Sequence, residues 1–494
     1  MTFRPGIHLL VVLAMTFAGC AKQPVATTPP PDPLQLLAHD ITAATALPGV
    51  RRAAWGIVVQ SLDRDERLFA LNPGTLLVPA SVAKLVSLAG AVDAVGWNFR
   101  FETEVRAAGP IVDGTLDGDL IVVGSGDPSI GGRAGQALSV WVDALKAIGL
   151  KRIEGRIVGD DNAGEEPRPQ LAWAWDDLGY TTGALWGALN LRENRMTVAI
   201  TPAVSLNDRP TISVGPAESF RLLRNRTTTG TTDSSLLIWP EQRPGEPFLT
   251  IAGSVPAGAP PAELLVSAGN PTLWFASGLR HALVEGGIDI TGDAFDIDDL
   301  TANPEWATST VLYTHQSPTL AEIAQPLLRD SINLYGEAVL KLNADRDGLP
   351  TNDAALEGLR TRLTTWGIPT DAWQLIDGSG LSRRNAIAPE TLVAVLRRMY
   401  DPAWTSPWIS GLPVAGRDGT LANRMRGTPA EDNLRAKTGT MSNIRSLAGY
   451  VRTLDGEVLA FVLLADGFEG SGREATEAID RIAARLAGFS RVAE

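Results

Sequence analysis

Short apolar runs separated by polar turns predict a β-hairpin and then a helix near the start of the chain. Residues 54–59 and 68–71 are apolar and flank a polar turn, as in two antiparallel strands. Residues 77–91 combine good helix formers with Pro79 near the first turn, and Gly96 is a natural stop. The pattern therefore predicts strand, strand and helix, in this order.

A second set of elements is predicted in the last third of the chain. Residues 318–342 have a helical pattern with a polar stretch that suits a turn between helices. Residues 433–440, 446–452 and 458–465 alternate with turns and predict consecutive antiparallel strands. Helices beside an antiparallel sheet indicate an α/β protein of the α+β type.

The intervening stretch, residues 98–306, has a different composition. It is rich in Gly, Asp and Pro, and its apolar runs are short. The runs that predict strands lie at residues 120–123, 156–159, 196–200, 236–239 and 248–251. This stretch is therefore expected to form accessory β-rich modules.

Composition and charge exclude several classes of protein. A chain of 494 residues is expected to divide into more than one domain. The formal charge of −13 argues against nucleic acid as a partner, because such binding depends on clustered Lys and Arg. Cys20 is the only cysteine, which excludes an internal disulfide and any cysteine-based zinc or iron–sulfur site. No metal site is predicted.

The amino-terminal segment predicts export and a lipid anchor. Residues 7–19 are mostly apolar but too few to span a bilayer, as in a secretory signal. The run ends in small residues before Cys20 and resembles a bacterial lipobox, although Phe17 stands where Leu is usual. The alternative is a plain signal peptide that leaves Cys20 without a role. Residues 21–33 are rich in Pro and Thr and predict a tether.

Ser81 and Lys84 form the first candidate catalytic pair. They are three residues apart near a helix N-terminus, so their side chains share one face. A serine becomes a good nucleophile when a base takes its proton, and a buried lysine can be that base, whereas arginine cannot. Only six of the 43 basic residues are lysine, which makes a lysine at this position more informative. A solvated Ser–Lys pair of no function remains the alternative.

Ser331 and Asn333 form a second candidate motif. Their spacing suits a turn between helices, from which both side chains point into a cleft. Ser331 can relay a proton between Lys84 and a leaving amine, and the Asn333 amide can bind a substrate carbonyl. A cap or an ordinary turn is the alternative.

Lys437, Thr438, Gly439 and Thr440 form the third motif, on the first of the predicted carboxy-terminal strands. An edge strand can pair with an extended peptide, and Gly439 leaves room where the substrate backbone would lie. Lys437 and Thr438 offer a cation and a hydroxyl to a terminal carboxylate. The amide of Thr440, with that of Ser81, can form an oxyanion hole.

Three motifs in this order, Ser-x-x-Lys, Ser-x-Asn and Lys-Thr-Gly, are the signature set of penicillin-binding proteins and serine β-lactamases. The chain resembles the class C low-molecular-mass penicillin-binding proteins, which are D-alanyl-D-alanine carboxypeptidases and endopeptidases. The phrases that carry the resemblance are VPASVAKL (78–85), GDLIVVGSGDP (118–128), WAWDDLG (173–179), HQSP (315–318), DGSGLSR (377–383) and KTGT (437–440). They extend along nearly all of the chain after the tether.

The resemblance implies a serine β-lactamase/transpeptidase-like domain, with an antiparallel sheet flanked by helices, that inserted β-rich domains split. The predicted parts are a lipoprotein signal peptide (1–20), a tether (21–33), a discontinuous catalytic domain (34–97 and 307–494) and inserted domains (98–306), the inner one at about 200–270.

The resemblance also implies the roles of the motif residues. Ser81 is the acylated nucleophile, Lys84 its base, Ser331 and Asn333 the second motif, and the strand from Lys437 to Thr440 the carboxylate and oxyanion strand.

Asp177 and Arg383 match family positions near the substrate side chain. Alternatively, Asp177 caps a turn and Arg383 pairs with a surface carboxylate. Asn443 stands where the family usually has glycine, which affects subsite details rather than the core chemistry.

The implied reaction is acyl transfer from peptidoglycan stem peptides, without metal or cofactor, inhibited by β-lactams that mimic D-Ala-D-Ala. The expected location is the periplasm, with a lipid anchor on Cys20, and Ala21 favours the outer membrane. Two alternatives stay open: a β-lactamase or esterase of the same fold, and a catalytically silent cell-wall-binding lipoprotein.

Overall fold

The computed structural model describes residues 1–2, 6, 32–215, 222–243, 246, 248–301, 309–345 and 348–492. The predicted signal, Cys20 and most of the predicted tether lie outside these residues. Within the described part of the chain, no helix combines the length and the apolar character that a membrane span requires.

A five-stranded antiparallel sheet joins the two ends of the chain. Its strand order is β2 (Arg67–Leu71), β1 (Ala54–Ser61), β22 (Val458–Asp466), β21 (Ile444–Arg452) and β20 (Arg435–Met441). The predicted hairpin and the predicted carboxy-terminal strands are confirmed, and β1 connects them by pairing with both β2 and β22. The strand that carries the third motif, β20, is an edge strand.

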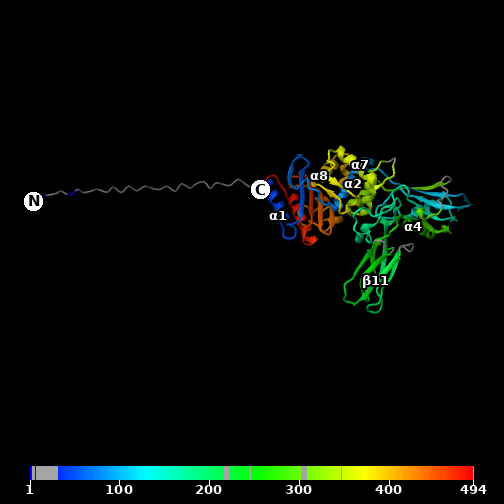
Figure 1. Cartoon of the computed structure of the whole chain (residues 1–494). Coiled ribbons are helices and arrows are strands. Elements are labelled where there is room, and N and C mark those ends of the chain that lie inside the picture. The colour runs from blue at the N-terminus through cyan, green and yellow to red at the C-terminus, as the bar shows by residue number, and fades with distance from the viewer. Residues whose placement is uncertain are drawn as a thin grey trace.

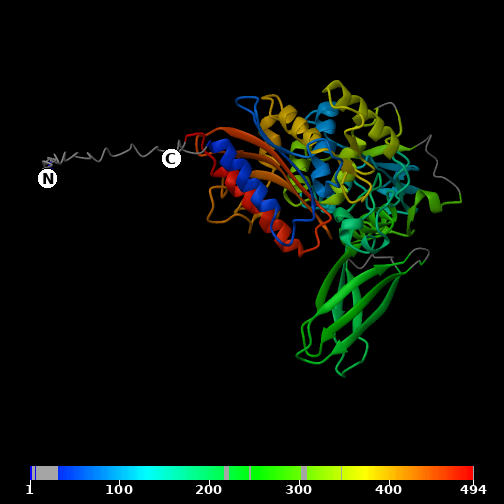
Figure 2. The same cartoon turned by 60° about the vertical axis from the view of Figure 1, so that its left-hand side comes forward.

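Helices cover both faces of this sheet. On one face, α1 (Pro33–Thr45) and α10 (Gly472–Ala487) lie side by side (Figure 2). On the other face, α8 (Pro389–Met399) packs against β1 and β22, and α2 (Ala83–Val95) belongs to the same apolar core. Because both faces are covered, every residue of β22 except Asp466 is buried.

The predicted helical region at 318–342 forms two helices, and the predicted turn between helices is confirmed. These two helices are α5 (Leu320–Arg329) and α6 (Asn333–Lys341). Two further helices later in the chain are α7 (Asn352–Thr365) and α9 (Thr405–Gly411). Ser331, in the turn between α5 and α6, has a φ of 63°, which ends the first helix.

The chain between α2 and α5 forms a second large sheet, of mixed type (Figure 1). Its order is β16 (Ala294–Asp296), β8 (Ile157–Asp160), β6 (Asp119–Val123), β3 (Glu102–Ala108) and β17 (Thr310–Gln316). The helix α4 (Pro271–Glu285) packs against β8 and β16, and α3 (Leu138–Ala147) packs against β17.

Smaller sheets complete this part of the molecule. Four short strands form one of them, in the order β15 (Asp289–Ile290), β7 (Arg152–Ile153), β5 (Thr115–Leu116) and β4 (Ile111–Val112). Strands β18 (Trp373–Gln374) and β19 (Ala386–Ile387) pair near the catalytic motifs.

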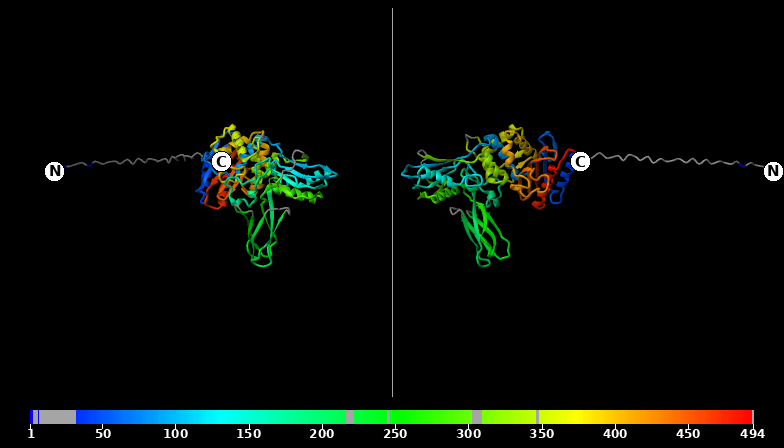
Figure 3. Two further views of the ribbon diagram at one scale, coloured as in Figure 1. Left: turned by 45° about the vertical axis from the view of Figure 1, so that its right-hand side comes forward. Right: turned by 180° about the vertical axis from the view of Figure 1, so that it is seen from behind.

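Six further strands form two three-stranded sheets, and the part around β11 projects from the rest of the molecule (Figure 3). One sheet has the order β10 (Thr211–Gly215), β9 (Arg195–Thr201) and β14 (Ala262–Ser267), and the other β11 (Leu223–Gly230), β13 (Leu249–Pro256) and β12 (Leu237–Gln242). The strands predicted from apolar runs in this stretch are confirmed.

Candidate active site

Ser81 and Lys84 are in direct contact, but not on the single helix that the sequence predicted. Ser81 lies on a 3₁₀ turn, η1 (Ala80–Val82), and Lys84 lies in the first turn of α2. Side chains three residues apart eclipse each other in a 3₁₀ turn. The Lys84 Nζ therefore donates to the Ser81 Oγ at 2.9 Å. Ala80, just before the serine, has a φ of 49°, a conformation that non-glycine residues adopt rarely.

The Lys84 amine is fully buried and held by two further acceptors. It donates to the Asn333 Oδ1 at 2.7 Å and to the Ser379 carbonyl oxygen at 2.5 Å. The Asn333 amide is itself oriented, because its Nδ2 donates to the Thr182 carbonyl oxygen at 2.8 Å. The first and second motifs therefore meet at Lys84.

Burial lowers the pKa of Lys84 to about 7, although the carboxylates of Asp377 and Glu337 act in the opposite direction. An amide oxygen and a backbone carbonyl oxygen can only accept hydrogen bonds, whereas a hydroxyl can also donate. When Lys84 loses a proton, its lone pair therefore faces Ser81, the one partner of the three that has a proton to give. This geometry suits a general base.

Lys437 on β20 is also fully buried and holds the second motif. Its Nζ donates to the Ser331 Oγ at 2.7 Å and to the Thr438 carbonyl oxygen at 2.8 Å. Burial, and after it the charge of Lys84, lower the pKa of Lys437 well below its usual range. The amine is thus covered, and the members of this strand that line the cleft are Thr438, Thr440 and Met441, of which the two threonines carry hydroxyls.

Gly439 has a different structural role from the predicted one. A side chain at this position would not occupy the space of a substrate backbone, because the Cβ would lie 2.7 Å from the Pro79 carbonyl oxygen and would collide with the Ser446 Oγ. The Ser446 hydroxyl in turn donates to the same carbonyl at 2.7 Å. Glycine therefore allows β20 to approach the turn that carries Ser81.

Asp177 and Arg383 line the same cleft as Ser81. Asp177 ends the 3₁₀ turn η2 (Trp175–Asp177), and burial raises its pKa, with Asp176 adding to the rise and Arg383 opposing it. The Arg383 guanidinium extends toward Asn443 and donates to its Oδ1 at 3.3 Å. The structure thus brings both residues to the cleft, close enough for their charges to interact.

The cleft has a volume of about 370 Å³ and is open to solvent. Residues of all three motifs line it, together with side chains from both walls: Ser81, Asp177, Thr182, Asp330, Ser331, Asn333, Gly380, Leu381, Arg383, Thr420, Thr438, Thr440, Met441 and Ser442. Only Lys84 and Lys437 among the predicted catalytic residues lie beneath its surface.

The sequence motifs did not reveal several groups that position this site. Glu337 is buried and accepts the N–H groups of Gly378 and Ser379 at 3.2 and 2.9 Å, which orients the carbonyl that binds Lys84. Asp377 is buried and accepts from the Trp173 Nε1 at 2.7 Å. The phrase at 377–383 was a signal for this loop, but a backbone carbonyl leaves no mark in a sequence.

Comparison with known proteins identifies the family. The D-Ala-D-Ala carboxypeptidase 3 (S13) family matches residues 37–486. The chain belongs to this family. It is 33% identical over 467 residues to the D-alanyl-D-alanine carboxypeptidase of Actinomadura sp. (strain R39), which covers 92% of this chain and 85% of that protein. It is 25% identical to the D-alanyl-D-alanine carboxypeptidase DacB of Haemophilus influenzae, over 84% and 85% of the two chains.

Solved structures agree on the fold. Penicillin-binding protein 4 (dacB) of Haemophilus influenzae superposes with a TM-score of 0.77 at 23% identity, over 90% of this chain and 98% of that one. Its complex with a β-lactam gives a TM-score of 0.73. The predictions of the family, of the α+β penicillin-binding fold and of a serine-type D-Ala-D-Ala carboxypeptidase are confirmed.

Proposed function

We propose that this S13 peptidase removes the terminal D-alanine from peptidoglycan stem peptides through an acyl-enzyme on Ser81. The observation that supports this most strongly is the contact between the Ser81 Oγ and the buried Lys84 amine at the base of an open cleft. A nucleophile beside a base of near-neutral pKa is the arrangement that acyl transfer requires.

In the first half-reaction, the Ser81 Oγ attacks the carbonyl carbon of the penultimate D-alanine while Lys84 takes the hydroxyl proton. The amides of Ser81 and Thr440 stabilise the oxyanion. The C–N bond then breaks, and Ser331 relays the proton held by Lys84 to the leaving amine. In the second half-reaction, water gives a proton to Lys84 and attacks the ester. The ester C–O bond then breaks, Lys84 returns this proton to the Ser81 Oγ, and the shortened peptide is released.

The substrate carboxylate is expected to lie along β20. Thr438 and Thr440 offer hydroxyls at the cleft surface, and Lys437 lies directly beneath them. A carboxylate there favours the protonated lysine, because an opposite charge nearby raises the pKa of an amine. Asp177 and Arg383 would then contact the side chain of the stem peptide.

Release of D-alanine from a synthetic peptide that ends in D-Ala-D-Ala tests this proposal. Ser81→Ala should abolish release, whereas Ser406→Ala should leave it unchanged, because Ser406 is exposed on α9 and does not line the cleft. Unchanged release by Ser81→Ala would contradict both the proposal and the assignment of the nucleophile.

Two alternatives are separated by the fate of penicillin and of cross-linked substrates. A β-lactamase or esterase of this fold would turn the drug over rapidly, whereas the proposed enzyme keeps a persistent adduct. A catalytically silent cell-wall-binding protein would form no adduct. Endopeptidase action is part of the proposal, and cleavage of cross-linked muropeptide dimers would measure it.

We further propose that the protein is a periplasmic lipoprotein anchored through Cys20, with Ala21 favouring the outer membrane. The support is the sequence of the amino-terminal segment, whose small residues precede the cysteine. Labelling with a palmitate analogue should mark the wild type and not Cys20→Ala, which should appear in the soluble fraction. A labelled Cys20→Ala protein would contradict the anchor.

We also propose the domain division expected from the sequence, with residues 34–97 and 307–494 as the catalytic domain and 98–306 as inserted domains. The proposed inner insertion, at about 200–270, includes strands β10 to β14. Limited proteolysis that cuts between these parts, and leaves each one intact, would support the division.

A further inference from the structure

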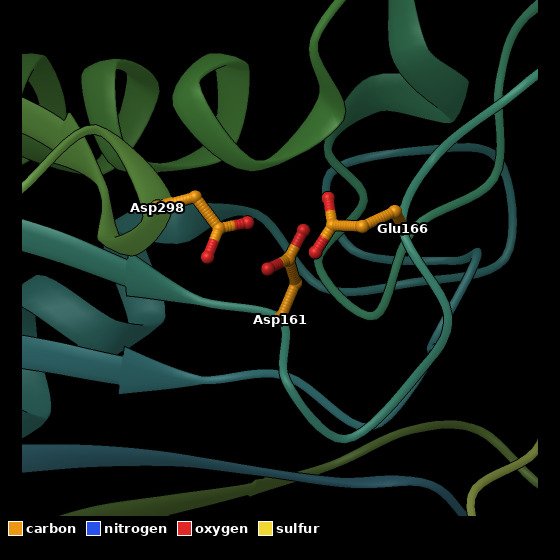
Figure 4. Close-up of side chains that lie close together, drawn as sticks. All are labelled: Asp161, Glu166 and Asp298. Atoms are coloured by element: carbon orange, nitrogen blue, oxygen red, sulfur yellow. The ribbon is translucent and has the colours of Figure 1, made fainter.

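Three carboxylates face one another at the end of the mixed sheet, outside the cleft. Asp161 directly follows β8, Glu166 lies in the loop after it, and Asp298 lies in the 3₁₀ turn η5 (Ile297–Asp299). One oxygen of each lies within 4.8 Å of the others. Figure 4 shows the Asp161 carboxylate between those of Glu166 and Asp298. We call these three residues the acidic cluster.

Asp161 is a buried carboxylate, and one of its two oxygens has no hydrogen-bond donor among the described residues. Its side chain is buried, with only 2% of the residue exposed. The Oδ2 accepts from the Thr272 Oγ1 at 2.5 Å, but the Oδ1 is buried without any hydrogen-bond donor. In the described part of the chain, none of the recorded ion pairs joins a lysine or arginine to the acidic cluster. A buried carboxylate oxygen with no donor and no cation is strongly destabilising.

The surrounding residues hold the acidic cluster in place. Asp296 caps η5 by accepting the Asp298 N–H at 3.3 Å, and its other oxygen accepts from the Asn270 Nδ2 at 2.7 Å. The fold therefore holds the three carboxyl groups within reach of a single ion.

We propose that Asp161, Glu166 and Asp298 bind one divalent cation that prefers oxygen ligands. All three donors are carboxylate oxygens, which suit Ca²⁺ and Mg²⁺ rather than metals that select histidine or cysteine. Glu166 and Asp298 are exposed, so water completes the coordination on the open side. Ca²⁺ is the ion expected to bind more tightly, because it accepts several carboxylates in flexible geometry, whereas Mg²⁺ retains more of its waters.

The cation would fasten the start of a segment whose other end reaches the cleft. Residue Glu165, next to the acidic cluster, forms an ion pair with Lys341 of α6, the helix that begins at Asn333. Further along, Trp173 donates to Asp377 beneath the catalytic loop, and Asp177 lines the cleft. The ion would thus stabilise the segment from Asp161 to Asp177, which connects the mixed sheet with the cleft, although the ion itself binds outside the cleft.

Calorimetric titration of the full chain, freed of metal with EDTA, tests the proposal with CaCl₂ and MgCl₂ in turn. The wild type should bind one ion per chain, and the melting temperature should rise on addition of the ion that binds. Glu166→Gln, at an exposed position, and Asp161→Asn should each weaken binding at least about tenfold. Asp299→Asn is the matched control, since it removes one charge from the same turn outside the acidic cluster and should bind as the wild type does.

Absence of binding by the wild type at millimolar concentrations of both ions would overturn the proposal. Wild-type affinity in Glu166→Gln would also overturn it, whether or not Asp161→Asn folds. Acylation by benzylpenicillin, measured on the same samples, separates this outcome from the catalytic proposal: intact acylation without ion binding would overturn the cation site alone.

Discussion

The catalytic cleft and the acidic cluster both bury charge, but they compensate it differently. In the cleft, Lys84 has three acceptors, and the buried carboxylate of Asp377 accepts from four donors. In the acidic cluster, the buried Oδ1 of Asp161 has no donor. A buried charge whose hydrogen-bond partners belong to the protein has its pKa set by the fold. A buried carboxylate oxygen without a donor instead indicates a ligand that binds from outside the protein.

Compensation also explains how two buried lysines can share one site. The Lys437 amine donates to Ser331 and to a backbone carbonyl, and both lysines have lowered pKa values because of burial. Burial makes the neutral amine accessible at neutral pH, and the fixed acceptors decide in which direction the lone pair points. The cleft thereby obtains a base although no histidine is among its lining residues.

The largest effect is expected from Lys84→Arg, which breaks the compensated arrangement directly. Arginine keeps the charge but does not deprotonate, so kcat/KM for D-alanine release should fall by about 10²–10⁴-fold. Lys151→Arg, at an exposed position, is the control and should retain wild-type activity. Activity of Lys84→Arg close to that of the wild type would exclude Lys84 as the base.

The next largest effect is expected from Gly439→Ala, which separates β20 from the turn of Ser81. The added methyl group would meet the Pro79 carbonyl and the Ser446 hydroxyl, so unfolding should become easier by about 1–3 kcal/mol and acylation should slow. Gly215→Ala is the matched strand control, because a Cβ there meets nothing within 4 Å. Chemical denaturation compares the two, and equal stability would contradict the assigned close approach.

The pH dependence of acylation tests the effect of burial in the cleft, because it reports how far burial lowers the pKa of Lys84. The neutral amine is the active form, and its fraction falls as pH drops below the pKa of about 7. The value of kcat/KM should therefore rise with pH through about 7 and fall about tenfold per unit below it. A profile with no inflection between pH 6 and pH 8, measured by stopped-flow acylation, would mean that another group limits the step.

The smallest effect is expected from Asp177→Asn, because this residue lines the cleft but belongs to none of the three motifs. Loss of this charge should raise KM by up to about fivefold for a peptide with a free side-chain amine, with kcat nearly unchanged, because the site is partly exposed. An acetylated amine should remove the effect. Asp176→Asn, at the exposed neighbouring position, is the control. A fall in kcat rather than a rise in KM would contradict a role in binding alone and would indicate that Asp177 takes part in the chemical step.

The sequence predicted the local parts of this site, and the structure supplied the long-range ones. Ser81 and Lys84 lie one turn apart, so their contact follows from local geometry. The carbonyl of Ser379 and the carboxylate of Glu337 could not be predicted, because they depend on how a distant loop packs against two helices. The same holds for Gly439, where the neighbour that requires glycine is the turn before Ser81.

The acidic cluster also depends on a long-range contact that the sequence does not reveal. Asp161 and Glu166 are close in sequence, but Asp298 reaches them only through the pairing of β16 with β8. In an acidic chain, single aspartates and glutamates carry little information until the sheet brings them together. No metal site was predicted from the sequence. Calorimetry with Ca²⁺ tests whether the acidic cluster binds one ion.

Intact-protein mass spectrometry with and without benzylpenicillin tests the central claim most directly. The wild type should gain one penicilloyl group per chain, and proteolysis should place it on the peptide that contains Ser81. Ser81→Ala should gain none, and Ser406→Ala should react as the wild type does. No adduct on the wild type, or an adduct that persists in Ser81→Ala, would contradict the assignment of Ser81 as the nucleophile.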